Sequence, residues 1–347
     1  MWRVPRLAVP LIFVLCLVLS SVPAFTQSLP NKKEAREWVR RAQEASDLQS
    51  PDAPPYHLVA KIRYTINDKT MDGTYEILWA APDRYRVEFR MGDIGETDLV
   101  LGDKKYVLRT TPTMTLPMWS VSSILFFSTP LPSAQSSQSV HKLSWAGDMA
   151  NRQICAAVGE SVTLDNKLCF DAKTTEVTAT HTQPITNGSY RTVIDAFTLD
   201  LTDYASLGKM RYPQHLERRS GPESIVATVE KWEAVQKFDE SVFVPLPNST
   251  AWDWCSTPKI EMPPSNRPYV LIPFIPYFGL YKVVRPDGTV KEATLLFGSA
   301  KGPAKEMLDM ERHNRSAVHI CGGKPVEYET MVVIWPTSLP LSVFMLR

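Results

Sequence analysis

The chain has 347 residues, 44% hydrophobic residues and a formal net charge of +1. This length allows two domains, and the near-zero charge excludes a global electrostatic attraction to nucleic acid or to an acidic partner. The 28 prolines lie mostly at the ends of segments, which is typical of an all-β protein with many turns.

Residues 1–24 have the order of a secretory signal peptide. Two arginines precede an apolar run, residues 7–22, and small residues offer a cleavage site after Ala24. The apolar run has about 16 residues, whereas a membrane-spanning helix needs roughly 20. The sequence therefore predicts export to the periplasm. An uncleaved inner-membrane anchor formed by residues 7–22 is the alternative.

The segment 31–50 is predicted to contain a helix. Asn31 suits the N-cap, and Glu34 follows three residues later, as in a capping box. We expect the helix to pack on a sheet with its basic face in solvent, and contact with anionic lipid is the alternative. Apolar residues recur at helical spacing among the basic ones: Trp38, Ala42 and Ala45.

From residue 58 to residue 109 the side chains alternate between apolar and polar. Successive side chains of a strand point to opposite faces, so each run has one apolar and one mostly polar face. An antiparallel meander with one packed and one solvated face is predicted. Its strands are 58–66, 73–79, 84–90, 98–101 and 105–109, joined by a short connection from Asn67 to Gly73 and by turns at Pro82-Asp83 and Gly102-Asp103.

The segment 112–127 differs from the strands, because it concentrates bulky apolar side chains around two prolines. Two interpretations remain open: a lid over a cavity, and a plug that fills the core. The stretch 130–139 is rich in Ser, Gln and Pro and is expected to form an exposed loop.

Strand patterns resume after this loop and continue to residue 235. Together with the meander they give about ten strands without a β-α-β rhythm, which predicts a mainly β (α+β) fold. We expect one large antiparallel sheet, curved into a half-barrel. The later strands are 154–158, 167–170, 175–182, 190–201, 210–212 and 224–235.

Residues 31–248 resemble the LolA/LolB periplasmic lipoprotein-carrier family. The resemblance rests on the leading helix, on the meander with Trp79-Ala-Ala-Pro-Asp-Arg-Tyr-Arg86, and on the closing Phe238-Asp-Glu-Ser-Val-Phe-Val-Pro245. In that family a half-barrel wraps a hydrophobic cavity, so the resemblance implies a lipid or lipoprotein acyl chain as the ligand. The alternative is that the bulky side chains only fill the core. The implied cavity or lid residues are Tyr75, Trp79, Tyr85, Phe89, Met118, Trp119, Phe126 and Phe127.

Four cysteines remain after the signal peptide, and export favours their oxidation. Four cysteines allow three pairings. Cys155 and Cys169 lie on the two strands of an expected hairpin, so we predict that they pair, and that Cys255 pairs with Cys321 within a second domain. A metal site is not expected, because there is no Cys-x-x-Cys and the six histidines are scattered.

Residues 269–336 are predicted to form a small β-β-α-β domain. A proline-rich linker, 249–268, precedes it and an apolar tail, 337–347, follows it. Asp287-Gly288 between two alternating runs is a hairpin signal. The expected elements are strands at 279–284 and 289–297, a helix at 303–312 and a closing strand at 326–335.

This element order resembles the TonB C-terminal domain. The family's aromatic run before Gly-Lys-Pro-Val is replaced here by Ala317-Val-His-Ile-Cys321, and the linker is far shorter than a TonB spacer. The resemblance therefore implies docking of an envelope protein partner through an exposed strand edge, rather than energy transduction. The matching residues are Gly279, Asp287-Gly288-x-Val290, Gly298-Ser299 and Gly323-Lys-Pro-Val326.

No catalytic motif stands out in the sequence. It has no Gly-x-Ser-x-Gly, no His-Glu-x-x-His and no phosphate-binding glycine loop. We therefore expect no enzyme, no cofactor, no metal and no nucleic-acid partner. The predicted function is that of an exported cell-envelope protein that binds a lipid or other apolar ligand and docks to an envelope partner. The alternative is a periplasmic interaction protein, or a TonB-family transport accessory, with a filled core.

Overall fold

The computed structural model describes most of the chain after the predicted signal peptide. The described residues are 29–126, 140–146, 153–158, 164–171, 174, 176–184, 197–256, 258–261, 271–272, 278–297, 301–334 and 342–343. The predictions for the signal peptide, for the loop 130–139 and for Phe127 concern residues outside these ranges.

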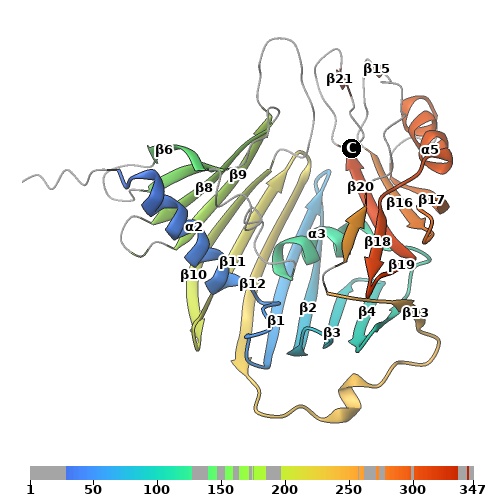
Figure 1. The fold of residues 1–347 in the computed structure, drawn as a ribbon, viewed down its shortest axis with the longest axis horizontal. Helices are drawn as coiled ribbons and strands as arrows, with labels where there is room; N and C mark the ends of the chain where they lie inside the picture. The colour runs from blue at the N-terminus through green and yellow to red at the C-terminus, as the bar shows by residue number, and fades with distance from the viewer. Residues whose placement is uncertain are drawn as a thin grey trace, which may run out of the picture.

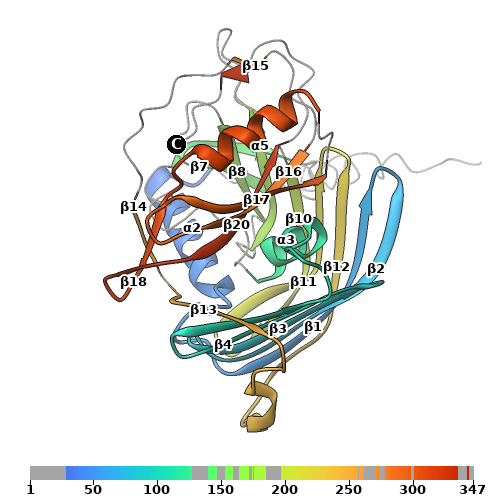
Figure 2. The same ribbon diagram turned by 90° about the vertical axis from the view of Figure 1, so that its right-hand side faces the viewer.

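The largest element is an antiparallel sheet that curves around two helices (Figures 1 and 2). The described part of this sheet has 13 strands in the order β13-β5-β4-β3-β2-β1-β12-β11-β10-β9-β8-β7-β6. The predicted mainly β fold with a large curved antiparallel sheet is therefore confirmed. The strands are β1 (Tyr56–Ile66), β2 (Lys69–Ala81), β3 (Arg84–Met91), β4 (Ile94–Leu101), β5 (Lys104–Arg109), β6 (Val140–Ala146), β7 (Gln153–Val158), β8 (Leu164–Asp171), β9 (Val177–Pro184), β10 (Phe197–Leu207), β11 (Met210–Ser220), β12 (Glu223–Ala234) and β13 (Thr250–Asp253).

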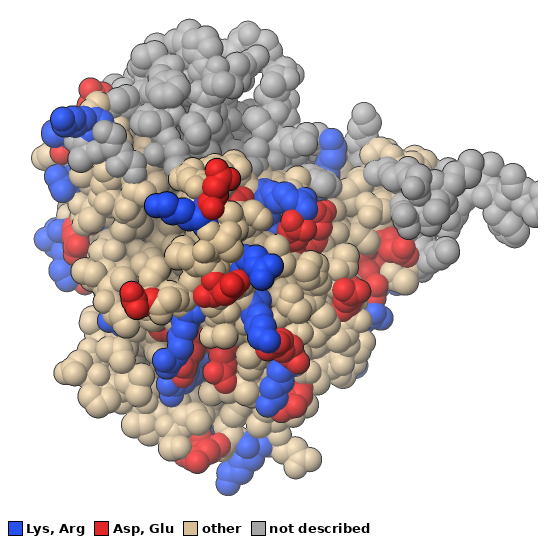
Figure 3. Space-filling model, turned by 180° about the vertical axis from the view of Figure 1, so that it is seen from behind, with Lys and Arg blue, Asp and Glu red and all other residues tan. Residues whose placement is uncertain are grey.

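The meander strands have one buried and one solvated face, as their alternation predicts. The buried faces of β1 to β3 belong to one hydrophobic core. The outer face carries ion pairs across the strands, such as Lys61 with Glu230 at 2.5 Å and Arg63 with Asp72 at 3.2 Å. Figure 3, seen from behind, shows basic and acidic side chains intermixed on this face. A binding site for an apolar ligand therefore has to lie on the concave side.

The connection between β1 and β2 is shorter than predicted. Asn67 and Asp68 alone form it, and both have positive φ, at 48° and 63°. Asn and Asp tolerate this left-handed conformation, which a two-residue hairpin requires. Gly73, predicted to end the connection, lies inside β2, where an added Cβ would come within 2.4 Å of the Arg90 backbone oxygen on β3. Here the glycine permits close approach of two strands.

Helix α2 (Lys32–Ser46) packs on the concave face of the sheet. Its predicted N-cap is confirmed, since the Asn31 side chain accepts a hydrogen bond from the Glu34 backbone N–H at 3.0 Å. Ala35 and Val39 are fully buried, while the predicted Trp38 is only half-buried against the core. The helix covers strands β6 and β11 (Figure 1).

Helix α3 (Leu116–Leu125) occupies the segment 112–127, for which no helix was predicted. Thr115 caps it, and Pro117 lies in its first turn. Its apolar residues surround the helix instead of forming one stripe, because the helix is enclosed by the curved sheet (Figure 2). Two tyrosine hydroxyls fix it to the sheet: Tyr75 on β2 donates to the Ser122 hydroxyl at 3.2 Å, and Tyr212 on β11 donates to the Leu125 carbonyl at 2.9 Å.

The C-terminal unit contains the predicted order β-β-α-β with an additional hairpin before the last strand. Its sheet has the order β17-β16-β20, and Ala304 and Met307 of α5 pack against Phe278 and Leu280. The resemblance to the TonB C-terminal domain stays a prediction. The elements are β16 (Phe278–Val284), β17 (Val290–Phe297), α5 (Pro303–His313), β18 (Val318–Cys321), β19 (Lys324–Val326) and β20 (Tyr328–Ile334).

The segment predicted as a linker contributes strands to both parts of the molecule. Strand β13 pairs with β5 of the large sheet, and β14 (Lys259–Glu261) pairs with β18. In the predicted tail, β21 (Ser342–Val343) pairs with β15 (Leu271–Ile272). The segment 250–261 therefore runs along both units instead of forming a free spacer between them.

The structure contains both predicted disulfides. Cys155 on β7 lies directly opposite Cys169 on β8 and is bonded to it. The Cys255–Cys321 bond closes a sequence separation of 66 residues. Cys255 follows β13 of the large sheet, so this disulfide connects the large sheet to the C-terminal unit. The sequence had led us to expect both cysteines within a second domain.

Candidate ligand-binding cavity

A cavity of about 390 Å³ lies where the concave face of the meander and α3 meet the C-terminal unit. Three parts of the chain that are far apart in sequence form its wall. The meander and α3 contribute Tyr85, Val87 and Met118. Strand β13 contributes Trp252, and the segment after it contributes Trp254. The C-terminal unit contributes His319, Tyr328, Thr330 and Met331.

Five of the eight predicted cavity residues line this space. They are Tyr75, Tyr85, Met118, Trp119 and Phe126. Trp79 and Phe89, which are 1% and 0% exposed, are not among the residues that line it. The eighth, Phe127, is outside the described residues. That these side chains contact a ligand stays a prediction, because lining a cavity is not the same as contacting a ligand.

Stacked aromatic rings hold one wall of the cavity in place. Trp79 lies between Tyr56 and Tyr85, with ring centres 6.0 and 5.2 Å away. Tyr85 in turn packs against Phe126 at 5.1 Å and against Trp254 at 6.5 Å. Aromatic contacts of this kind are each worth roughly 0.5–1.5 kcal/mol beyond the area they bury. The core residue Trp79 thus positions the cavity residue Tyr85.

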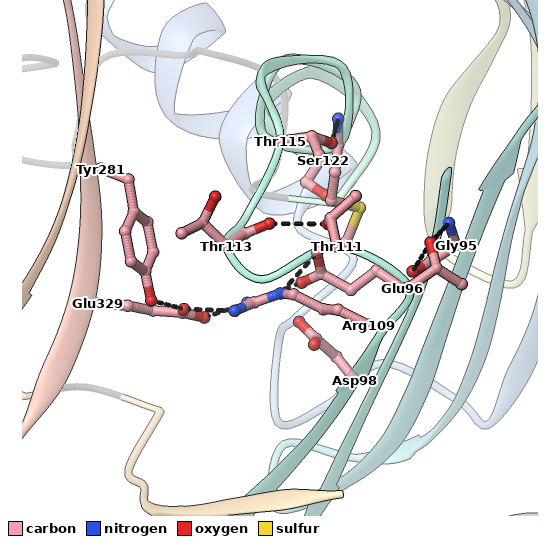
Figure 4. Close-up of polar contacts among 12 residues, drawn as sticks. Gly95, Glu96, Asp98, Arg109, Thr111, Thr113, Thr115, Ser122, Tyr281 and Glu329 are labelled. Carbon is pink, nitrogen blue, oxygen red and sulfur yellow. Dashed lines mark hydrogen bonds and ion pairs between the residues drawn. The ribbon is translucent and has the colours of Figure 1, made fainter. Parts of the chain in front are cut away.

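A buried charge network joins the large sheet to the C-terminal unit beside the cavity (Figure 4). Arg109 on β5 donates to Glu96 on β4 at 2.9 Å and to Glu329 on β20 at 2.7 Å. Tyr281 on β16 donates its hydroxyl to Glu329 at 3.0 Å. The side chains of Arg109, Glu96 and Glu329 are only 8%, 2% and 9% exposed.

The pKa values of the two glutamates in this network are shifted in opposite directions. Burial, followed by the nearby charge of Asp98, raises the pKa of Glu96 to about 7, against the lowering effect of Arg109. Burial also acts to raise the pKa of Glu329. There the hydrogen bond from Arg109 and the charges of Lys105 and Arg109 outweigh burial, and the pKa of Glu329 lies below its usual value.

Asp98 and Lys105 extend the network into the cavity, and both line it. Lys105 Nζ lies 2.8 Å from Asp98 Oδ2. The other carboxylate oxygen, Asp98 Oδ1, is buried without a hydrogen-bond partner. A buried acceptor without a partner costs roughly 1–3 kcal/mol.

Part of the cavity wall was missed in the sequence analysis. Trp252 and Trp254 lie in the segment interpreted as a linker, and the wall from β20 belongs to the predicted second domain. One signal for this wall was present in the sequence. Trp254 immediately precedes Cys255, and the predicted bond from Cys255 to Cys321 brings Trp254 close to the C-terminal unit. The charges Glu96, Arg109 and Glu329 gave no signal, since each sits at an ordinary polar position of a strand.

A second hollow of about 700 Å³ lies near the start of α3. It is lined by the end of β1, the residues before α3 and the end of β17, and none of its lining residues is charged. They include Tyr64, Ile66, Met71, Leu116, Leu296 and Phe297. The two hollows therefore differ in that only the first has charged side chains in its wall.

Within the described ranges, no three Asp, Glu, His or Cys side chains are grouped so as to hold a metal ion. None of the helices in the described part of the chain has the length and apolar character needed to cross a membrane.

Comparison with known proteins gives only distant similarities. No protein-family model matches the chain, and no curated protein is similar to it. The LolA superfamily protein NE2245 from Nitrosomonas europaea is 11% identical, with 60% of this chain and 97% of that chain covered and a TM-score of 0.38. A DUF1329 family protein from Desulfovibrio piger is 8% identical, with 62% and 98% covered and a TM-score of 0.37. MucB is 9% identical, with 88% and 94% covered and a TM-score of 0.33. The first belongs to a family that the sequence resembles, but identities and scores this low show neither the family nor the function of the chain.

Proposed function

We propose that this chain is an exported binding protein that holds the apolar part of a small amphiphile, such as an acyl chain, in the cavity beside α3. The observation that carries the proposal is the cavity of about 390 Å³, whose wall is mainly apolar and includes aromatic side chains such as Tyr85, Trp119 and Trp254. Its volume falls within the roughly 300–1,000 Å³ of small-molecule sites. A concave, mainly apolar space with a few polar groups in its wall is the usual form of a small-molecule site, and this supports the proposal.

The walls of the cavity are prepared for binding. The Tyr75 and Tyr212 hydroxyls tie α3 to the sheet, and the Cys255–Cys321 bond holds the segment with Trp254 against the C-terminal unit. A wall that is already ordered loses little conformational entropy when a ligand enters. A rigid cavity therefore supports binding of a compact apolar group.

Export is proposed from two independent features. The first is the N-terminal order of charges, apolar run and small residues. The second is the presence of two disulfides, Cys155–Cys169 and Cys255–Cys321, because disulfides persist in oxidising compartments such as the periplasm.

The binding proposal can be tested with the neutral fluorescent probe N-phenyl-1-naphthylamine. We expect saturable enhancement of its fluorescence by the mature chain, and loss of this enhancement in Thr330→Phe, because a larger side chain at this lining position fills the cavity. Thr294→Phe on β17 is the matched control, since Thr294 lines neither hollow described above. Equal probe binding by both variants and the wild type would place the ligand elsewhere and contradict the proposal.

A second candidate function is docking of a partner through β17. This strand forms one edge of the sheet β17-β16-β20, and an extended partner segment can add to such an edge. A photo-reactive residue at Glu292 on β17 is expected to crosslink the partner in cells, whereas one at Lys305 on α5 is not. Crosslinks at both positions, or at neither, would contradict docking at this edge.

A further inference from the structure

We propose that the head group of the ligand is uncharged and carries a hydroxyl, which forms a hydrogen bond with the His319 ring inside the cavity. This inference rests on the proposed function, because it names the chemical class of the ligand in the same site. Three observations support it: the pairing of the charged side chains in the described wall, the accessible ring nitrogens of His319, and the fixed position of that ring.

The charged side chains of the described wall are neutralised by counter-ions. The wall contains four carboxylates, and each of them forms an ion pair with a lysine or an arginine. The pairs are Asp98–Lys105, Asp253–Lys104, Glu327–Lys291 and Glu329–Arg109. The described wall therefore offers no unpaired charge to a head group of either sign.

Two of these pairs are largely buried, so a ligand does not readily separate them. The side chains of Asp98, Lys105, Arg109 and Glu329 are 8–17% exposed. Taking one partner away would leave an uncompensated charge in a low-dielectric environment, which is strongly unfavourable. A charged head group that left the pairs intact would itself lose its hydration without gaining a counter-ion. An uncharged head group avoids both costs.

His319 offers the contact that an uncharged head group needs. It lines the cavity, and no hydrogen bond joins its ring to another residue in the described part of the chain. The buried polar atoms without a partner include the indole nitrogens of Trp252 and Trp254 but neither nitrogen of the His319 ring. The His319 nitrogens therefore remain accessible to a ligand.

The protonation state of His319 matches a hydroxyl. Burial lowers the pKa of the imidazole, so at neutral pH the ring is uncharged, with one donor and one acceptor nitrogen. A hydroxyl both donates and accepts, and it can therefore bind either nitrogen. An ammonium group can only donate and a carboxylate can only accept, so each of them fits a single nitrogen.

The His319 ring is held in position before a ligand enters. It stacks on the Tyr328 ring with a centre-to-centre distance of 3.6 Å and an angle of 4° between the planes. The Tyr328 hydroxyl in turn donates to the Ala317 carbonyl at 2.8 Å. A ring fixed in this way loses little conformational entropy when it accepts a hydrogen bond.

Displacement of N-phenyl-1-naphthylamine by octanol, octylamine and octanoate at neutral pH tests the inference, because the three competitors share one chain and differ in the charge of the head group. We expect octanol to bind at least about tenfold more tightly than either charged competitor, since an unpaired charge is costly to take out of water. Equal affinities, tighter binding of a charged competitor, or no displacement by octanol would overturn the inference but leave the proposed function intact. Absence of binding of the fluorescent probe itself would contradict the proposed function.

His319→Phe assigns the hydroxyl contact to this ring. The variant keeps an aromatic ring beside Tyr328 but removes both nitrogens. The ratio of octanol to 1-chlorooctane affinity is expected to fall about fivefold, as for one hydrogen bond of typical net strength. This ratio within one protein is insensitive to a partial loss of folding. His215→Phe on β11 is the matched control, because His215 lines neither hollow, and it should keep the wild-type ratio. An unchanged ratio in His319→Phe would contradict the assignment.

Lys105→Met tests whether charge pairing is what excludes a charged head group. It leaves Asp98 without its counter-ion while keeping an apolar stem of similar length. The ratio of octylamine to octanol affinity is therefore expected to rise at least about threefold. Lys61→Met on the outer face, where Lys61 pairs with Glu230 at 2.5 Å, is the matched control and should keep the wild-type ratio. A ratio that does not rise in Lys105→Met would contradict the role given to the ion pairs.

Discussion

Arg109 is the residue that connects two carboxylates from different parts of the chain inside the protein. Replacement of Arg109 by Met leaves Glu96 and Glu329 buried without their common partner. Breaking a buried ion pair in this way costs roughly 3–5 kcal/mol. We expect a loss of this size in the free energy of unfolding, measured by urea denaturation. Arg63→Met on the outer face removes an exposed pair and is expected to cost at most about 1 kcal/mol. Equal losses in the two variants would contradict a central role for Arg109.

Glu96 makes the stability depend on pH in a defined direction. Its pKa rises from 4.5 to about 7 on folding, so between these pH values the folded state binds more protons than the unfolded state. The free energy of unfolding is therefore expected to fall as pH rises from about 4.5 to about 7, by roughly 3 kcal/mol for this one group. Below 4.5 the group contributes no further change.

Urea denaturation between pH 4.5 and 8 measures this effect. In Glu96→Gln the free energy of unfolding is expected to decrease much less over this pH range, because glutamine does not titrate. Glu329→Gln should show the same decrease as the wild type. The pKa of Glu329 is lowered, so the contribution of Glu329 to stability is lost only at more acidic pH. A wild-type curve that rises across this window would contradict the assignment to Glu96.

At the scale of elements, α3 separates positions that hold the fold from positions that face the ligand. Ile124 is 1% exposed in the core, whereas Trp119 is half-buried and lines the cavity. We expect Ile124→Ala to cost roughly 2–5 kcal/mol in stability with unchanged probe binding at a temperature where the variant is folded. Trp119→Ala is expected to cost less stability and to weaken probe binding several-fold. The reverse pattern would mean that α3 is a plug without a binding role.

The strands and α2 could be predicted from the sequence because their periodicity is local. The meander strands and the Asn31 cap lie where alternation and helical spacing place them. Helix α3 could not be predicted, because its buried residues lie on more than one side and leave no single apolar stripe to reveal its period. Strands β6 and β13 were also missed, since both find their place only by pairing with β7 and β5.

At the scale of the whole molecule, the Cys255–Cys321 disulfide holds the C-terminal unit against the large sheet. In the chain-entropy model a loop of 66 residues gives the disulfide a contribution of about 4 kcal/mol. The double variant Cys255→Ala/Cys321→Ala is therefore expected to unfold at a lower denaturant concentration and to bind the probe more weakly, because one wall of the cavity loses its tether.

Removal of the Cys155–Cys169 bond is the matched comparison for this prediction. It closes a separation of only 14 residues, between strands far from the cavity in the sheet order, and its loss is expected to cost about 3 kcal/mol without changing probe affinity. Weaker probe binding in this variant, with full binding in the other, would contradict the role given to Cys255–Cys321.

The cavity could be predicted only in part, because its wall depends on contacts between distant segments. Tyr85 and Met118 were implied as cavity residues by the resemblance to the LolA/LolB family, and they line the space. The contribution of Glu329 and Thr330 depends on how the C-terminal unit docks, through pairs such as Arg109 with Glu329 across 220 residues. No local pattern encodes that contact, so the sequence yielded one side of the site and not the other.

Native mass spectrometry of the mature chain, residues 25–347, tests the central claim most directly when the protein is purified from the periplasm without detergent. The account predicts a mass excess that corresponds to one small amphiphile, that is lost on mild activation and that is absent in Thr330→Phe. A bare mass for the wild-type chain, together with an absence of probe binding, would contradict it and would indicate a protein whose core is filled and whose function lies in contacts with a partner.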